Sequence, residues 1–123
     1  MGKKILVVDD EKEIRETVKK TLESEGYIAK TANSTDSALL KVQQWDPDLL
    51  LLDILIPGMD LESFFNKLDQ IGAAVKVLYL SVVEEFEAER RGLLKLSGKI
   101  QGYIKKPFSL ASLLSKIREA LSN

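Results

Sequence analysis

The sequence contains neither cysteine nor histidine. Without cysteine, the chain can form no disulfide bond and no thiolate metal site. Without histidine, it can build neither a histidine-ligated zinc site nor a serine–histidine–aspartate triad, and it cannot itself carry a phosphohistidine. A metal ion on this chain would therefore have to be held by oxygen atoms.

Long apolar runs and an excess of positive charge are also missing. No apolar stretch approaches the ~20 residues of a membrane span, and the start, "MGKKILVVDD", has too short an apolar run for a signal peptide. Eighteen Lys+Arg against 19 Asp+Glu give a net charge of −1, so no overall positive field attracts nucleic acid. We therefore expect a soluble cytoplasmic protein that contacts neither a membrane nor nucleic acid directly.

Apolar runs typical of strands alternate along the chain with segments whose apolar residues recur at helical spacing. The expected strands are residues 4–8, 27–32, 48–52, 75–80 and 101–106. The expected helices are residues 11–26, 33–45, 61–72, 84–98 and 108–123. This alternation predicts an α/β fold: one doubly wound (βα)5 domain whose five-stranded parallel sheet carries helices on both faces. The strand at 27–32 is the least apolar, which favours a place near an edge.

The segment "LLLLDILIPGMD" places Asp53 directly after four leucines, although burying an uncompensated carboxylate is costly. In such sheets the working site lies beyond the carboxyl ends of the strands. The polar residues expected at those ends are Asp9, Asp10, Asp53, Ser81 and Lys106. Each alone has a simpler explanation as a helix cap, a turn residue or a solvated loop residue. All five at one edge favour a functional site.

The chemistry of this set points to phosphoryl transfer. Three close carboxylates repel unless a cation intervenes, and with oxygen ligands only, Mg²⁺ is the expected ion. A carboxylate can act as a nucleophile and form an acyl phosphate, and Asp53 on the central strand suits this role. Lys106 would neutralise phosphoryl oxygens, and Ser81 can donate a hydrogen bond to one of them.

These motifs resemble the receiver domain of two-component response regulators. The resemblance covers the whole chain and is carried by "ILVVDDE", "LLLLDILIPGMD", the serine after "VLYL", and "YIKKPF". It implies a flavodoxin-like sheet with strand order 2-1-3-4-5 and a single receiver domain over residues 1–123, without an output domain. It also implies a signalling module that catalyses only its own Mg²⁺-dependent phosphorylation and dephosphorylation.

The resemblance assigns the phosphorylation site by position. Asp53 would accept a phosphoryl group from a histidine of a sensor kinase or phosphotransfer protein. Asp9 and Asp10 would hold Mg²⁺ together with Asp53 and the backbone carbonyl of Leu55.

The resemblance also implies a switch. Lys106 would contact the phosphoryl group, with a cis peptide bond to Pro107. Ser81 would move toward the phosphoryl group and Tyr103 would change rotamer with it. The surface of the fourth helix, fifth strand and fifth helix would then bind an unknown downstream protein differently, as a monomer or a phosphorylation-dependent homodimer.

Two residues depart from the family pattern. Leu61 stands where glycine is usual, which implies either strain at a positive φ or a rebuilt loop. Val82 stands where a small residue is usual, and its bulk predicts restricted access and a long-lived acyl phosphate. The segment between Ser81 and Lys106 is also a few residues longer than usual.

Two other functions fit parts of the sequence. A receiver-like interaction module that no longer needs phosphorylation would account for Leu61 and Val82. A haloacid-dehalogenase-type phosphatase also uses an aspartate nucleophile, but it would need a second aspartate where Glu11 stands. No glycine-rich loop follows the first strand, which argues against a nucleotide-binding site. The segment "EEFEAERR" is most simply a solvated helix face, and its alternative role is that of a partner-docking face.

Overall fold

The protein forms one five-stranded parallel sheet, seen here in a computed structural model that describes residues 2–122. The strands are β1 (Lys4–Val8), β2 (Ile28–Ala32), β3 (Leu49–Leu52), β4 (Lys76–Ser81) and β5 (Ile100–Lys105). Their order across the sheet is β2-β1-β3-β4-β5, and each neighbouring pair is parallel. The predicted α/β fold and strand order are therefore confirmed. The least apolar strand, β2, lies at an edge as expected.

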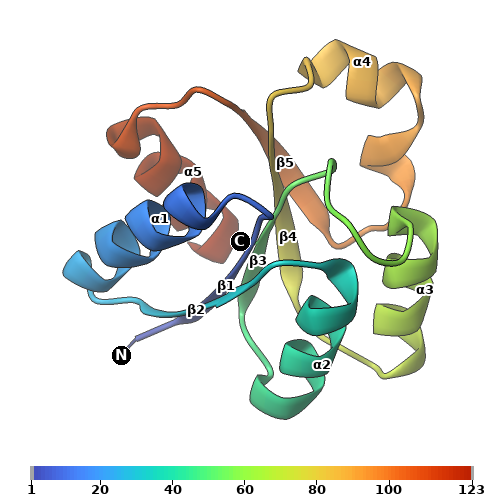
Figure 1. Cartoon of the computed structure of the whole chain (residues 1–123), viewed down its shortest axis with the longest axis horizontal. Coiled ribbons are helices and arrows are strands. Elements are labelled where there is room, and N and C mark those ends of the chain that lie inside the picture. Colours follow the sequence, from blue (N-terminus) through green and yellow to red (C-terminus); the bar gives the residue numbers. More distant parts are fainter. Residues whose placement is uncertain (1, 123) are drawn as a thin grey trace.

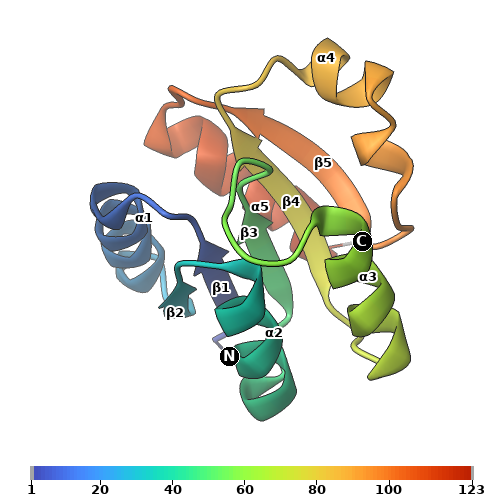
Figure 2. The same ribbon diagram turned by 45° about the vertical axis from the view of Figure 1, so that its right-hand side comes forward.

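Helices cover both faces of the sheet. They are α1 (Lys12–Ser24), α2 (Thr35–Trp45), α3 (Leu61–Gln70), α4 (Glu85–Arg90) and α5 (Leu110–Ser122). Figure 1 shows α1 and α5 on one side of the sheet and α2, α3 and α4 on the other, and Figure 2 separates the two layers. Asn123, the last residue of the final predicted helix, lies outside the described residues. No helix within 2–122 combines the length and hydropathy needed to cross a bilayer.

The leucine run of β3 is explained by burial on both faces. Leu49 and Leu51 pack with α1 and α5, whereas Leu50 and Leu52 pack with α2 and α3. All four side chains are 0% exposed. A strand covered on both faces has no polar side, so its sequence is continuously apolar rather than alternating.

The fourth helix is shorter than predicted. The single helix expected at 84–98 is wrong: α4 ends at Arg90 and a separate 3₁₀ helix covers Leu93–Lys95. The break is at Gly92, which has a left-handed φ of 77°. A left-handed glycine is a common helix terminator because it has no Cβ to clash.

Helical spacing over residues 84–98 predicts an apolar face that begins with Phe86, and this is also wrong, since Phe86 is 70% exposed. The acidic and basic side chains of the same segment are solvated, as predicted for "EEFEAERR". Glu87 pairs with Arg90 at 2.8 Å and with Arg91 at 2.9 Å, all at the surface. Only Ala88 among the residues of α4 is buried.

Leu61 is accommodated without backbone strain. Asp60 is the N-cap of α3, where its Oδ1 accepts a hydrogen bond from the Ser63 N–H at 2.9 Å, and Leu61 is the first helical residue. Among residues 2–122, the non-glycine residue with a positive φ is Asp46, not Leu61. Leu61 is 9% exposed and packs in the core on the side of α2 and α3. The strained backbone that the sequence left open is therefore absent at this position.

Candidate functional site

The polar residues singled out in the sequence lie at the carboxyl edge of the sheet. Asp9 follows β1, Asp53 follows β3, Ser81 is the last residue of β4, and Lys106 follows β5. The parallel ladder continues to this edge: the Asp53 N–H donates to the Val8 carbonyl at 3.0 Å, and the Lys106 N–H to the Ser81 carbonyl at 2.8 Å. Backbone pairing therefore sets the positions of these side chains.

All four residues are buried, with exposed fractions, counted over the whole residue, of 0% for Asp9, 4% for Asp53, 0% for Ser81 and 5% for Lys106. Lys106 Nζ lies 2.6 Å from Asp9 Oδ2 and 3.0 Å from Asp53 Oδ2. Burial alone would lower the pKa of the Lys106 ammonium, but the hydrogen bonds to Asp9 and Asp53 outweigh burial and raise it. Lys106 therefore stays charged and compensates two buried carboxylates. Its positive charge offsets the free-energy cost of burying Asp53.

Backbone amides fix the other carboxylate oxygens. Asp9 Oδ1 accepts from the Glu11 N–H at 2.9 Å, and Asp53 Oδ1 accepts from the Leu55 N–H at 2.9 Å. Burial raises the pKa of the Asp9 carboxyl, although the bonds from Lys106 and Glu11 oppose this shift. Each carboxylate is thus held in one orientation, because Lys106 binds its Oδ2 and a backbone N–H binds its Oδ1. Leu55, which supplies the N–H to Asp53, is itself 51% exposed.

The acidic cluster fits a divalent cation. Asp9, Asp10 and Asp53 each offer a carboxylate oxygen, and these oxygens lie within 4.8 Å of one another. Asp10 is exposed, so the cluster is open to solvent on one side. Three carboxylates and the single ammonium of Lys106 leave a formal charge of −2 (−3 + 1). A hard cation that prefers carboxylate oxygens and keeps some of its waters, such as Mg²⁺, matches this donor set.

Ser81 and Tyr103 meet through the loop between β4 and α4. Ser81 Oγ accepts a hydrogen bond from the Val83 N–H at 3.2 Å, and the Tyr103 hydroxyl donates to the Val83 carbonyl. The Tyr103 ring is 4% exposed and packs edge-on against Tyr79, with ring centroids 6.0 Å apart. Burial raises the pKa of the Tyr103 hydroxyl, which therefore remains a donor at neutral pH. The peptide bond between Lys106 and Pro107 is cis.

One contact of the site was missed in the sequence. Glu11 is the first residue of the helix expected at 11–26, where an acid needs no partner beyond the helix, yet its Oε1 lies 3.4 Å from Lys106 Nζ. Glu11 was visible in the sequence as the third acid of "DDE", but the direction of its side chain depends on the turn between β1 and α1. Beside this contact is an open hollow of about 430 Å³ lined by Glu11, Ile14, Thr17, Val82, Lys106, Pro107, Phe108 and Leu110. Val82 is 55% exposed at this hollow.

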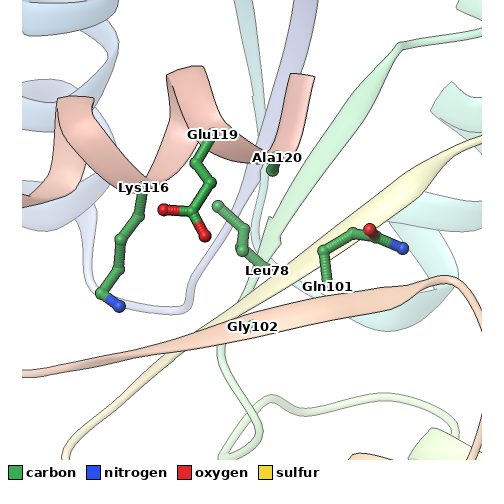
Figure 3. Close-up of a pocket in the computed structure, with 6 residues that line it drawn as sticks. All are labelled: Leu78, Gln101, Gly102, Lys116, Glu119 and Ala120. Atoms are coloured by element: carbon green, nitrogen blue, oxygen red, sulfur yellow. The ribbon is translucent and has the colours of Figure 1, made fainter. Parts of the chain in front are cut away.

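A second, much smaller cavity of about 50 Å³ lies between β5 and α5 and shares no residue with the acidic site. Figure 3 shows Lys116 and Glu119 extending from α5 above Gly102. Gly102 and Leu78 both line this cavity, and a Cβ on Gly102 would make a tight contact of 3.2 Å with Leu78 Cδ2. The size of the cavity suits at most a few waters.

Comparison with known sequences identifies the family of this chain. A sequence model of the response regulator receiver domain matches residues 5–118. Response regulator MprA of Mycobacterium leprae is 32% identical over 118 residues, which are 96% of this chain and 50% of that protein. The alkaline phosphatase synthesis transcriptional regulatory protein PhoP of Bacillus subtilis is 34% identical over 121 residues, which are 98% of this chain and 49% of that protein. The chain thus spans about half the length of these relatives.

Solved structures agree with the sequence comparison. The chemotaxis response regulator CheY4 of Vibrio cholerae superposes with a TM-score of 0.87 at 28% identity, covering 98% of this chain and 100% of that one. A CheY-like receiver domain protein of Methanospirillum hungatei gives 0.85 at 30% identity, with 99% and 95% covered. Receiver domains generally act as phosphorylation-activated switches in two-component systems and bind Mg²⁺ at an acidic pocket. This chain, with its buried lysine joined to two aspartates at the edge of such a sheet, belongs to the response regulator receiver domain family.

Proposed function

We propose that Asp53 is the phosphoryl acceptor of this receiver domain. The observation that carries the proposal is the 3.0 Å contact between Asp53 Oδ2 and Lys106 Nζ at the central strand of the sheet. Asp53 is 4% exposed, whereas Asp9 is fully buried and less accessible to a donor. Asp10 is exposed and belongs to the metal side of the cluster. Asp53 is thus the buried, lysine-bound carboxylate that a phosphodonor can still approach.

In the proposed reaction, an Asp53 carboxylate oxygen attacks the phosphorus of a phosphohistidine on a partner protein. A P–O bond forms, the P–N bond breaks, and its electron pair remains on the imidazole nitrogen of the partner. No general base is needed because a carboxylate nucleophile carries no proton that must be removed before it attacks. Lys106 donates hydrogen bonds to a phosphoryl oxygen and holds it next to the nucleophile.

Asp9, Asp10 and Asp53, with the backbone carbonyl of Leu55, would hold Mg²⁺. The ion, when bound, neutralises charge on the phosphoryl oxygens. The same residues, once the donor has left, would support hydrolysis of the acyl phosphate, which is the only other reaction we assign to this chain. Val82, exposed beside Lys106, predicts slow hydrolysis because it shields the phosphoryl group from water.

Ser81 and Tyr103 are the proposed switch residues. To donate to a phosphoryl oxygen, the Ser81 hydroxyl would turn away from the Val83 N–H that it now accepts. Because the Tyr103 hydroxyl binds the carbonyl of the same Val83, movement of this loop would release or retain the tyrosine ring. The result would be an altered surface on α4, β5 and α5.

The partners follow from the family. Response regulators interact with histidine kinases and downstream effectors, and we propose a sensor histidine kinase or phosphotransfer protein as the phosphodonor. We propose an unidentified protein as the target of the altered surface, and either a monomer or a phosphorylation-dependent homodimer as the active form. The cytoplasmic location and the single-domain organisation over residues 1–123 stay predictions.

The test is phosphorylation of the purified chain by acetyl phosphate in the presence of Mg²⁺, followed by intact-mass spectrometry. We expect one phosphoryl group per chain, stable in acid, removed by hydroxylamine and absent from the Asp53→Asn variant. Asp69→Asn is the control, because Asp69 is an exposed acid paired with Lys99 at 3.1 Å, outside the acidic cluster. Equal labelling of the Asp53→Asn variant and the wild type would contradict the proposal.

A further inference from the structure

We infer that Glu11 is a positioning residue that holds Lys106 in the resting site and slows phosphorylation by anionic small-molecule donors. This inference rests on the proposed function of Asp53. Glu11 Oε1 lies 3.4 Å from Lys106 Nζ, and the Glu11 side chain is 61% exposed whereas that of Lys106 is 6% exposed. Glu11 therefore reaches from the surface to a buried ammonium.

The ammonium has no donor to spare in this state. A lysine side chain has three N–H donors, and three carboxylate oxygens surround Lys106 Nζ: Asp9 at 2.6 Å, Asp53 at 3.0 Å and Glu11 at 3.4 Å. Asp9 and Asp53 are each fixed by a backbone N–H as well. Glu11 makes the longest of the three contacts and is the most exposed. An incoming phosphoryl oxygen would therefore replace Glu11 rather than either aspartate.

The carboxylate of Glu11 also adds charge where a donor must approach. Glu11 and Lys106 both line the hollow of about 430 Å³, together with Val82 and Pro107. With Asp9, Asp10 and Asp53, Glu11 brings four carboxylates to one ammonium, a formal charge of −3 (−4 + 1). Like charge at the mouth of a site lowers the local concentration of an anionic reactant, and salt weakens this effect.

A purely structural role for the Glu11 side chain is not supported by its contacts. Glu11 is the N-cap residue of α1, but in the part of the chain that the structure describes its side chain makes no capping hydrogen bond. The backbone N–H of Glu11 binds Asp9 Oδ1, and that bond is independent of the side chain. Replacing Glu11 by glutamine should therefore leave the helix intact and remove one negative charge from Lys106.

The experiment compares Glu11→Gln with Glu16→Gln. Glu16 is an equally exposed acid of α1, at 61%, and pairs with Lys12 at 3.8 Å instead of Lys106. Phosphorylation rates are measured at saturating Mg²⁺ with acetyl phosphate and with phosphoramidate, which carries one fewer negative charge. With acetyl phosphate, Asp53 oxygen attacks phosphorus, the P–O bond to the acetyl group breaks, and acetate leaves with the electron pair.

We expect Glu11→Gln to be phosphorylated by acetyl phosphate at least about threefold faster than the wild type. The acceleration should be smaller with phosphoramidate, and the acceleration with acetyl phosphate should shrink at high salt. Glu11→Asp, which retains the charge on a shorter side chain, should stay closer to the wild type. Glu16→Gln should match the wild type with both donors. Thermal unfolding of all variants checks that they are equally folded.

Equal rates for Glu11→Gln and Glu16→Gln with both donors would overturn the inference, and so would slower phosphorylation of Glu11→Gln. Either result would leave the proposed function standing as long as the wild type is phosphorylated and Asp53→Asn is not. Failure of the wild type to be phosphorylated would instead remove the proposed function itself.

Discussion

Lys106 Nζ lies 3.0 Å from Asp53 Oδ2, although 53 positions separate the two residues in the chain. Asp53 follows β3 and Lys106 follows β5, with β4 between these strands in the sheet. The contact exists because three parallel strands end at the same edge, so that the side chains following the outer two converge over the middle one. Assembly of the site is therefore inseparable from formation of this half of the sheet.

Removing the lysine should destabilise the fold, because Asp9 and Asp53 would be left buried without a compensating charge. We expect Lys106→Met to lower the free energy of unfolding by on the order of 3 kcal/mol at neutral pH in the absence of Mg²⁺. Added Mg²⁺ should stabilise the variant more than the wild type, because the metal then replaces the missing positive charge. Urea denaturation with and without EDTA, followed by fluorescence of the single tryptophan, measures both effects.

The control for this prediction is the neighbouring lysine. Lys105 is 41% exposed and pairs with Glu84 at 3.5 Å, a surface contact worth about 0–1 kcal/mol. Lys105→Met should therefore be close to the wild type and insensitive to Mg²⁺. If both variants lose the same stability, the buried ion pairs do not have the role given to them here.

The loop between β3 and α3 should not tolerate a side chain at Gly58. Gly58 has a φ of +107°, and a Cβ there would lie 2.5 Å from Thr35 Oγ1, whose hydroxyl donates to the Met59 carbonyl at 2.7 Å. We expect Gly58→Ala to lower the free energy of unfolding by at least about 2 kcal/mol more than Gly72→Ala does. Gly72 also has a positive φ, of +67°, but its Cβ would meet no atom within 4 Å. Chemical denaturation compares the two, and equal losses would show that the contact with Thr35 is unimportant.

The N-cap of α3 should make stability depend on pH. The hydrogen bonds from the Ser63 N–H and hydroxyl hold the pKa of the Asp60 carboxyl below its usual value of 3.8. A carboxyl whose pKa is lower in the folded than in the unfolded protein stabilises the fold at pH values above its usual pKa. This contribution is lost as the pH falls through the folded-state pKa. Asparagine keeps the capping acceptor but does not titrate. The stability advantage of the wild type over Asp60→Asn should therefore shrink below about pH 4, as measured by thermal unfolding across that range. A constant difference would contradict this account.

Two phenylalanines, Phe65 of α3 and Phe86 of α4, should differ sharply in how much their replacement destabilises the protein. Phe86 is 70% exposed and Phe65 is 1% exposed. We expect the free energy of unfolding of Phe86→Ala to stay within about 0.5 kcal/mol of the wild-type value, because the ring buries little apolar area in the folded protein. Phe65→Ala should cost about 3–5 kcal/mol, because it leaves a cavity beside Tyr79, against which Phe65 packs at 6.4 Å between ring centroids. A comparable loss for Phe86→Ala would show that this ring is covered in solution.

Local patterning was sufficient for most of the architecture. Apolar runs bounded by turn residues defined the strands, and apolar recurrence at helical spacing defined four of the five helices. Polar residues at the strand ends were recognisable as a set because parallel strands present their carboxyl ends at one edge. That rule brought Asp9, Asp53 and Lys106 together without coordinates, and the distances of 2.6 Å and 3.0 Å agree with it.

Only the tertiary structure showed the features that depend on how the turns direct the backbone from one helix or strand to the next. The apolar periodicity of the sequence continues across Gly92 because leucines follow it, but α4 ends at Arg90, just before the left-handed φ of 77° at Gly92. Phe86, expected on an apolar face, is 70% exposed. The inward position of Tyr103 depends on packing against Tyr79 and on the Val83 carbonyl. Glu11 meets Lys106 across 95 positions of sequence. Residue type and local spacing determine which faces are apolar and which strand ends are charged, whereas the meeting of two particular side chains requires the turns between elements to be fixed in space.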